Sequence, residues 1–339
     1  MQSTLTNAET QAARFAALNI LSAEFTAAQN LDDVLHIASV NVLTLMDGDR
    51  VSIAFVADNA DSFEVLALQG EEEVMPVGTS MPLGGTAVGL AVTEKRIIQL
   101  PKEAPLSTYA DSHILAEQGL QSLMVAPLSV GDQTIGSINI GSKQLYAFNE
   151  EDVHFMQQIA TLLAASIESL RLGVRIQTLA AIVESHPDFI GVSTVEGEAQ
   201  YVNPAGLAMI GLPKNYDVST MSAADFYIPK DAETMLNEGI PQALASGSWT
   251  SEAHLQRNDG SAIPVEQTIA VNYDAQNNPT GFSFTMRDIT ERVRTVEDQR
   301  RLTAQLEERL LQVNALQRAM THEGWSAFLT SPQPAHPRV

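Results

Sequence analysis

A long run of helical periodicity occupies the middle of the chain, between Asn149 and Ser185. Apolar side chains recur there at steps of three and four residues, the spacing that places them on one face of a helix: Met156, Ile159, Ala160, Leu163, Ile167 and Leu170. Asn149 can cap the helix. Gly173 lowers the stability of such a helix by about 1 kcal/mol relative to alanine. The apolar pattern nevertheless resumes at Leu179 and stops before Pro187. We predict one continuous helix between two modules, with a terminal helix plus a linker as the alternative.

The pattern before this helix predicts two helices followed by an antiparallel sheet. Helical spacing covers residues 8–28 and 31–45, and Asn30 is placed to cap the second helix. A short helix is expected after Gly84-Gly85-Thr86, and residues 101–112 are expected to form a long loop with a weak helix beyond it. Strand-forming runs occur at 51–57, 63–68, 97–100, 122–130 and 134–141. An antiparallel sheet flanked by helices fits this order.

The pattern after Pro187 predicts a second antiparallel sheet with short helices. Asn203 and Pro204 are typical of a helix start, because Asn caps the first turn and Pro suits the first helical position. A short helical piece is expected at 222–227, and a longer helix is expected at 231–245, ending at Gly247. Strands are expected at 188–193, 200–202, 249–256, 263–273 and 280–288.

From Thr290 onward the chain is predicted to be helical, with apolar residues near heptad spacing: Leu302, Leu306, Val313, Leu316 and Met320. Arg309 occupies one of the core positions and weakens the pattern. A parallel coiled coil is the functional interpretation, and an amphipathic helix packed on its own domain is the alternative. Residues 324–339 contain three prolines and are expected to be a disordered tail.

Composition excludes several classes of partner. The formal net charge of −22 argues against nucleic acids and anionic membrane surfaces, because binding them requires clustered Lys and Arg. Hydrophobic residues make up 45% of the chain, yet no apolar run reaches the roughly 18 residues of a membrane span. The first residues lack the pattern of a signal peptide. We therefore expect a cytoplasmic protein.

The absence of cysteine and the spacing of the histidines argue against several kinds of catalytic and metal site. The chain has no cysteine, which excludes disulfides, thiol catalysis and thiolate metal sites. No two of the seven histidines lie three to five residues apart, so no metal site is expected. His322-Glu323 matches two residues of the phosphoacceptor helix of sensor kinases, but Gly324 and Trp325 do not continue the motif. No catalytic residue is predicted, and an enzyme is not expected.

Two family resemblances organise these observations. Gly84-Gly85-Thr86-Ala87-Val88-Gly89 and the two strands and closing helix at 120–168 resemble a GAF domain. The later segments resemble a PAS domain, with its closing motif at Arg287-Asp288-Ile289-Thr290-Glu291-Arg292; the other matching segments are Asp188-Phe189-Ile190, Tyr201-Val202-Asn203-Pro204-Ala205 and Asn258-Asp259-Gly260. The resemblance implies an α+β fold of two antiparallel-sheet sensor domains joined by a long helix, with a C-terminal coiled-coil helix.

The expected domain limits follow from the same segments. They are an N-terminal helix at 1–28, a GAF-like domain at 29–172, a PAS-like domain with its linker helix at 173–292, a coiled-coil helix at 293–323 and the tail at 324–339.

In both families the ligand pocket lies between the sheet and the short helices. This implies two sets of candidate ligand-binding residues, Tyr109, His113 and Ser122 in the first domain and Phe226, Tyr227, His254 and Gln267 in the second. A noncovalent small ligand fits these residues, whereas covalent bilin or cysteinyl-flavin chemistry is excluded because cysteine is absent. The alternative is that both pockets are filled cores.

Two functions are left open. The first is a signal-transduction sensor that acts as a parallel homodimer and passes its state to a downstream kinase or output domain. The second is a ligand-free dimerisation or scaffold module, such as the sensory fragment of a histidine kinase. A reductase built on the GAF fold is the third hypothesis, and it is disfavoured because the known examples rely on cysteine.

Overall fold

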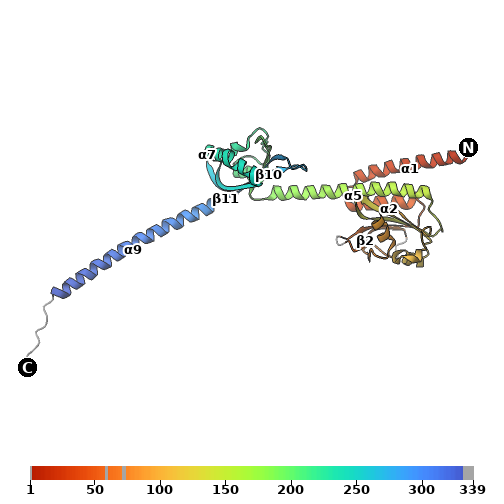
Figure 1. Cartoon of the computed structure of the whole chain (residues 1–339), viewed down its shortest axis with the longest axis horizontal. Helices are drawn as coiled ribbons and strands as arrows, with labels where there is room; N and C mark the ends of the chain where they lie inside the picture. The colour runs from red at the N-terminus through yellow and green to blue at the C-terminus, as the bar shows by residue number, and fades with distance from the viewer. Residues whose placement is uncertain (1, 58–59, 71–73, 331–339) are drawn as a thin grey trace, which may run out of the picture. The chain divides into compact units, whose positions relative to one another are not determined.

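The computed structural model describes residues 2–57, 60–70 and 74–330 (Figure 1). The chain divides into two compact units, Met1–Gln177 and Thr178–Val339. Each unit contains one antiparallel sheet with helices, in agreement with the expected α+β class. Among the described helices, none is both long enough and apolar enough to cross a membrane.

The first unit is built on a six-stranded antiparallel sheet with the strand order β3-β2-β1-β6-β5-β4. Five of its strands match the predicted runs, and the short strand β3 at the sheet edge was not predicted. The strands are β1 (Arg50–Val56), β2 (Ser62–Gly70), β3 (Ser80–Pro82), β4 (Ile98–Leu100), β5 (Ser122–Val130) and β6 (Gln133–Ser142).

Helices cover both faces of this sheet. One face packs against three helices in an apolar core, α1 (Gln2–Ala27), α2 (Leu31–Leu45) and α5 (Glu150–Ser185) (Figure 1). The opposite face packs against α3 (Ala87–Glu94), the single turn η1 (Leu106–Thr108) and α4 (Ala110–Glu117). The sheet therefore separates an extended helical layer from a layer of short helices.

The glycine-rich stretch before α3 forms a turn and a helix cap. Thr86 accepts a hydrogen bond from the backbone N–H of Gly89 at 3.0 Å, as expected for an N-cap. A Cβ added to Gly89 would lie 1.8 Å from the carbonyl oxygen of Leu83, so only glycine fits this close approach. These contacts support a turn and packing role for the motif.

The predicted loop at 101–112 is wrong at its end, because α4 already begins at Ala110. The buried carboxylate of Asp111 accepts hydrogen bonds from the backbone N–H groups of Ala87 at 2.7 Å and Val88 at 3.0 Å. These hydrogen bonds hold the start of α4 against the N-terminus of α3. Because they join segments more than 20 residues apart, the local sequence pattern could not predict where α4 begins.

Helix α5 is continuous, as predicted. Asn149 accepts hydrogen bonds from the backbone N–H groups of Glu151 at 2.8 Å and Asp152 at 3.1 Å, and Asp152 accepts one from the N–H of Asn149 at 2.8 Å. This reciprocal arrangement is a capping box. The first half of α5 carries buried apolar residues, whereas residues 171–182 are exposed on every side.

The second unit contains a five-stranded antiparallel sheet with the strand order β8-β7-β11-β10-β9. All five strands were predicted: β7 (Phe189–Ser193), β8 (Ala199–Val202), β9 (Ser248–Gln256), β10 (Ala262–Tyr273) and β11 (Pro279–Asp288). The register pairs Phe189 with Met286 and Gln267 with Ser251.

Short helices pack against this sheet around one apolar core. They are α6 (Pro204–Met209), η2 (Ala223–Phe226), α7 (Pro229–Thr234), the π-helical segment η3 (Met235–Gly239) and α8 (Ile240–Ser246). The single helix predicted at 231–245 is therefore interrupted by a π segment. Its predicted end is confirmed, because Gly247 has φ 89° in the left-handed region.

Helix α9 (Thr290–Thr330) follows β11 directly. It passes through Gly324, so residues 324–330 of the expected disordered tail are helical, and residues 331–339 lie outside the described part of the chain. One glycine inside a helix costs only about 1 kcal/mol, so Gly324 does not end α9. Apart from the half-buried Val293, the large apolar residues of α9 with described side chains are exposed. The coiled coil stays a prediction.

Candidate functional site

Three polar side chains lie side by side on the face of the first sheet that is covered by α3 and α4. Residues directly opposite each other on neighbouring strands share a face. Asn139 lies opposite Ser52 and Val125, and Ser137 lies opposite Ala54. Since Val125 and Ala54 belong to the apolar cluster under α3 and α4, the polar side chains face the same cluster.

These side chains are buried but not fully hydrogen-bonded. Ser137 is 0% exposed and Asn139 is 7% exposed. The amide nitrogen of Asn139 donates to Ser52 Oγ at 3.3 Å. Ser137 Oγ and Asn139 Oδ1 have no hydrogen-bond partner among the described residues. A buried polar atom without a partner costs about 1–3 kcal/mol, so a hydrogen bond from a ligand or water to either atom would be stabilising.

The sequence interpretation did not include these residues. Ser137 and Asn139 alternate with the buried Ile138 and Ile140 on a strand that is covered on both faces. Polar residues at alternate positions of such a strand are the signal that could have identified them.

The three residues predicted for the first domain do not come together. Ser122 is buried, but its hydroxyl donates to the carbonyl of Gln144 at 2.7 Å and accepts from the N–H of Ala147 at 3.2 Å. These bonds attach Ser122, the first residue of β5, to the connection between β6 and α5. Tyr109 is half-buried beside the apolar cluster, and the ring of His113 is exposed with Nε2 3.6 Å from Glu117. Their role in ligand binding stays a prediction.

In the second unit the structure joins two of the four predicted residues. The Tyr227 hydroxyl donates to Gln267 Oε1 at 2.5 Å, and Gln267 Nε2 donates to Ser251 Oγ at 3.1 Å. Tyr227 and Gln267 are both buried. Burial raises the pKa of Tyr227 above its ordinary value, and the charge of Asp231 adds to this effect. The phenol therefore remains a neutral hydrogen-bond donor in the core.

The other two residues lie apart from this pair. Phe226 packs edge-on against Phe189, with ring centroids 5.8 Å apart, and both rings line a cavity of about 10 Å³ between β7, β8 and η2. A cavity of this size has room for one water molecule. His254 lies on the outer face of β9, where Nδ1 is 2.9 Å from Asp231 Oδ2. It does not reach the core occupied by Tyr227 and Gln267.

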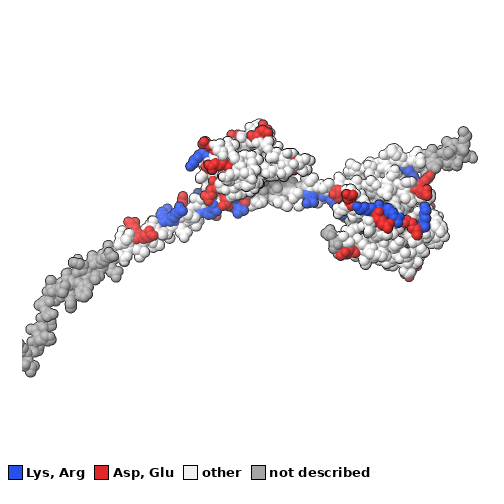
Figure 2. Space-filling view, viewed as in Figure 1, with Lys and Arg blue, Asp and Glu red and all other residues white. Residues whose placement is uncertain are grey.

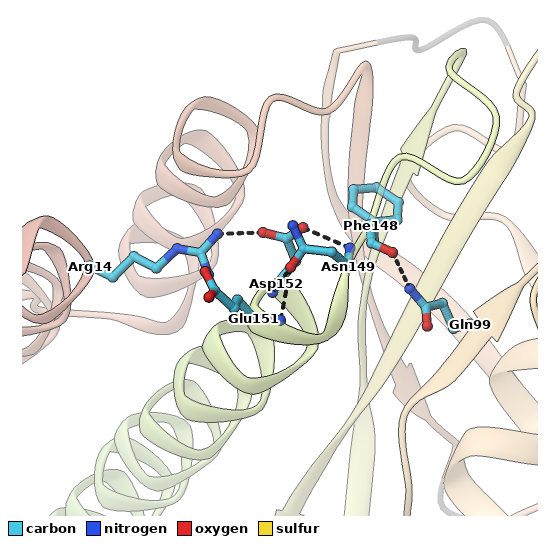
Figure 3. Close-up of polar contacts among 6 residues, drawn as sticks. All are labelled: Arg14, Gln99, Phe148, Asn149, Glu151 and Asp152. Carbon is cyan, nitrogen blue, oxygen red and sulfur yellow. Dashed lines mark hydrogen bonds and ion pairs between the residues drawn. The ribbon is translucent and has the colours of Figure 1, made fainter. Parts of the chain in front are cut away.

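A chain of hydrogen bonds connects β4 to the N-terminus of α5 and to α1 (Figure 3). Gln99 on β4 donates from its side-chain amide to the carbonyl oxygen of Phe148 at 2.5 Å. Phe148 precedes the cap residue Asn149, whose N–H donates to one carboxylate oxygen of Asp152. The other oxygen of Asp152 accepts a hydrogen bond from Arg14 of α1. The start of α5 is therefore held from two sides.

The end of α5 is held by a single residue of the second unit. The Asn203 side-chain nitrogen donates to the carbonyl oxygens of Val183 and His186 at 3.2 Å and of Asp188 at 2.9 Å. Its Oδ1 accepts from the N–H groups of Ile190 and Gly206, each at 2.9 Å. Asn203 is fully buried. It caps α6, as predicted, and also binds the last turn of α5.

Positive and negative side chains are mixed on the surface of the first unit that Figure 2 shows. On the face shown in Figure 2, Lys and Arg of the first unit lie next to Asp and Glu. Arg96 contacts both Glu94 and Glu103 at 2.6 Å, and these hydrogen bonds raise the pKa of its guanidinium. The described residues contain no group of three His, Asp or Glu side chains that could hold a metal ion.

The two units match two known families. Residues 30–167 match the family model of the GAF domain, and residues 187–291 match that of a PAS domain. The domain order agrees with the order expected from the sequence. No curated protein matches the chain.

Three solved structures illustrate the similarity. The GAF domain of a Coxiella burnetii phosphoenolpyruvate-protein phosphotransferase is 22% identical, and the match covers 48% of this chain and 96% of that chain with a TM-score of 0.43. The GAF domain of a Bacillus halodurans two-component sensor histidine kinase is 23% identical, with coverages of 43% and 99% and a TM-score of 0.38. A Colwellia psychrerythraea PAS domain is 22% identical, with coverages of 34% and 98% and a TM-score of 0.33. These are similarities of fold only.

Proposed function

We propose that this chain, which carries a GAF domain followed by a PAS domain, senses a small ligand or partner and relays its state through paired helices. GAF and PAS domains are typical sensor modules of signal transduction. One observation carries the proposal. Helix α5 is continuous, its first half is packed in the GAF core, and its last carbonyl groups are bound by Asn203 of the PAS domain.

The exposed half of α5 supports pairing with a second copy. Leu172, Ile176 and Leu179 are 49%, 66% and 55% exposed, and Val183 continues the same spacing. In heptad terms Ile176 and Val183 occupy a positions, and Leu172 and Leu179 occupy d positions. β-Branched residues at a positions with leucine at d positions favour a parallel coiled coil of two helices. This helix segment is exposed on all sides, and it would gain stability if a partner helix covered its apolar stripe.

The pairing can be tested with single cysteines, because the natural chain has none. Ile176→Cys and Leu179→Cys place a thiol at the centre of a parallel pair, where two copies come within disulfide distance. Ala181→Cys is the matched control, since position 181 lies on the opposite side of the helix. Mild oxidation is expected to give cross-linked dimers of the first two variants and not of the control.

Light scattering on the natural chain supplies the independent measurement. Twice the mass of one chain at micromolar concentration is expected. A concentration-independent monomer, together with equal cross-linking of all three variants, would refute the paired-helix part of the proposal.

The unpartnered atoms of Ser137 and Asn139 support a ligand in the GAF domain. The ligand class that fits is a small neutral molecule with a hydrogen-bond donor for Asn139 Oδ1 and a polar group for Ser137. Native mass spectrometry of the purified chain is expected to show an added small mass that is lost in Ser137→Ala/Asn139→Leu. Tyr227→Phe in the PAS core is the control and should retain the mass.

A ligand-free scaffold is the second candidate, and the small PAS cavity favours it for that domain. The cavity between β7, β8 and η2 has about 10 Å³ of space, which is room for one water molecule. If the added mass is absent and cross-linking is still specific, the chain is a dimerisation module. In either case we propose a cytoplasmic protein that passes the state of α9 to a kinase or another output domain.

A further inference from the structure

The helices before and after the PAS sheet are attached to neighbouring strands. Strands β7 and β11 pair with Phe189 opposite Met286, so Asp188 and Arg287 are the next cross-strand neighbours. Helix α5 ends at Ser185, three residues before Asp188. Helix α9 begins at Thr290, three residues after Arg287. The chain therefore enters and leaves the PAS sheet at adjacent positions.

An ion pair connects these two positions. Arg287 donates from Nε at 3.2 Å and from the terminal nitrogen Nη2 at 3.0 Å to Asp188 Oδ2. The Asp188 side chain is 13% exposed, whereas that of Arg287 is 67% exposed. Arg287 Nε also lies 3.4 Å from Asp188 Oδ1, so the guanidinium contacts both oxygens of the carboxylate.

Asp188 is also attached to the end of α5, and Asp288, the residue after Arg287, is attached to the start of α9. The carbonyl oxygen of Asp188 accepts from Asn203, which also binds the carbonyl oxygens of Val183 and His186 at the end of α5. On the other side, Asp288 accepts a hydrogen bond from the N–H of Thr290 at 2.8 Å. The end of α5 and the start of α9 are thus connected through few bonds.

This route avoids the centre of the PAS domain. Tyr227 caps the C-terminus of η2, and its partner Gln267 lies on β10. In the sheet, β11 lies between β10 and β7. The residues around the small cavity pack between β7, β8 and η2. None of these residues takes part in the bonds from Asn203 to Thr290.

We propose that Asp188 and Arg287 are positioning residues that couple α5 directly to α9 at one end of the PAS strands. The inference rests on the proposed relay function and deepens it, because it names the joint through which the relay passes. The two states of the joint are the intact ion pair and the broken pair. A change that loosens the last turn of α5 reaches α9 only in the first state, and the coupling acts equally in the reverse direction.

The test perturbs α5 and measures α9 in the full chain. Glu184→Gly loosens the last turn of α5, and Glu184→Ala is the matched control that removes the same exposed side chain but keeps helix propensity. The readout is amide hydrogen exchange at 293–296, in the first turns of α9. Glu184→Gly is expected to raise this exchange at least threefold over Glu184→Ala.

The same comparison is then made with Arg287→Met, where the Gly-to-Ala ratio at 293–296 should fall to about one. In Arg257→Met, which changes an arginine that follows the edge strand β9 and is bound to the carbonyl of Met209, the threefold ratio should persist. A ratio of one in the natural background, or an unchanged ratio in Arg287→Met, overturns the inference.

The reverse experiment uses Thr295→Gly against Thr295→Ala, read at 182–186. Reciprocal coupling predicts a similar ratio, and its absence also contradicts the joint. Exchange is measured within one chain, so a failure here is distinct from a failure of the cysteine cross-linking that tests helix pairing.

Discussion

Gln99 and Phe148 connect the edge of the GAF sheet to the residue that precedes the α5 cap. The Gln99 side chain is buried, and its amide donates to the Phe148 carbonyl at 2.5 Å (Figure 3). The neighbouring residues Ile98 and Leu100 point to the opposite face, into the apolar cluster beneath α3 and α4. A shift of that cluster therefore moves β4 and, through Gln99, the start of α5.

Gln99→Leu tests this connection. The substitution removes the donor and leaves the Phe148 carbonyl without its partner, so we expect a loss of about 1–3 kcal/mol in the stability of the first unit. Amide exchange at 150–154 should rise more than exchange at the opposite end of the unit. Gln121→Leu, at an exposed position next to β5, should leave both measurements unchanged. Equal behaviour of the two variants would show that the bond does not hold the α5 cap.

Asn203→Asp tests the role of the side-chain nitrogen. The aspartate can still accept from Ile190 and Gly206, but it cannot donate to the three carbonyl oxygens near the end of α5. Burying a carboxylate against carbonyl oxygens should destabilise the PAS unit by about 3 kcal/mol or more at neutral pH.

Burial raises the pKa of this aspartate, so the loss should become smaller as the pH falls from neutral toward about 4, because the protonated aspartate donates one hydrogen bond. Urea unfolding at several pH values measures it. Asn149→Asp is the control, because the exposed Asn149 cap uses only its acceptor oxygen. A loss of similar size in both variants would contradict the assignment.

Tyr227→Phe tests the buried phenol. Removal of the hydroxyl leaves Gln267 Oε1 buried without its donor, which should cost about 1–3 kcal/mol. The folded-state pKa of Tyr227 lies above its ordinary value of 10.0, so its contribution is fully present below that pH and is lost as the pH rises above it.

The difference in unfolding free energy between the natural chain and Tyr227→Phe should therefore narrow above pH 10.0. Denaturant unfolding at neutral and alkaline pH measures this difference. Tyr273→Phe, at a position 44% exposed, should show neither the loss nor the pH effect. A constant difference across this pH range would contradict the assigned burial effect.

Gly173→Ala tests whether the exposed half of α5 is limited by helix propensity. A Cβ at Gly173 meets nothing within 4 Å, so alanine should stabilise the helix by about 0.5–1 kcal/mol. Slower amide exchange around residue 173 and a higher melting temperature are the expected results. Gly136→Ala is the contrast, because its Cβ would lie 2.2 Å from the carbonyl oxygen of Ala54 and must disturb β1 and β6. A destabilised Gly173→Ala would show that this position requires glycine for another reason.

The helix caps, which depend on residues close together in the chain, were predictable from sequence. Asn149 and Asn203 were expected to cap helices because their residue types and the following residues fit a helix start, and both do so. The contacts of the Asn203 nitrogen with the end of α5 were not predictable, because they join residues that are 15 to 20 positions apart.

Strand alternation explains which predicted site residues lie inside the PAS core. Gln267 has the same parity as the buried Val265 and Ile269, and it points inward. His254 lies between the buried Ala253 and Leu255 and therefore points outward. Both facts follow from the period of two along a strand, so the sequence pattern alone is sufficient to assign these two residues to different faces.

The π segment Met235–Gly239 also follows from no local periodicity. It adds one residue to a turn between α7 and α8, and Gly239 allows the Trp249 ring to approach within 2.6 Å of where a Cβ would be. Pro241 lies at the start of α8, which follows this segment directly, and proline has no backbone N–H to donate to the carbonyl oxygen four residues earlier. The π segment therefore lies where an ordinary α-helix from Pro229 to Ser246 would lack a hydrogen bond.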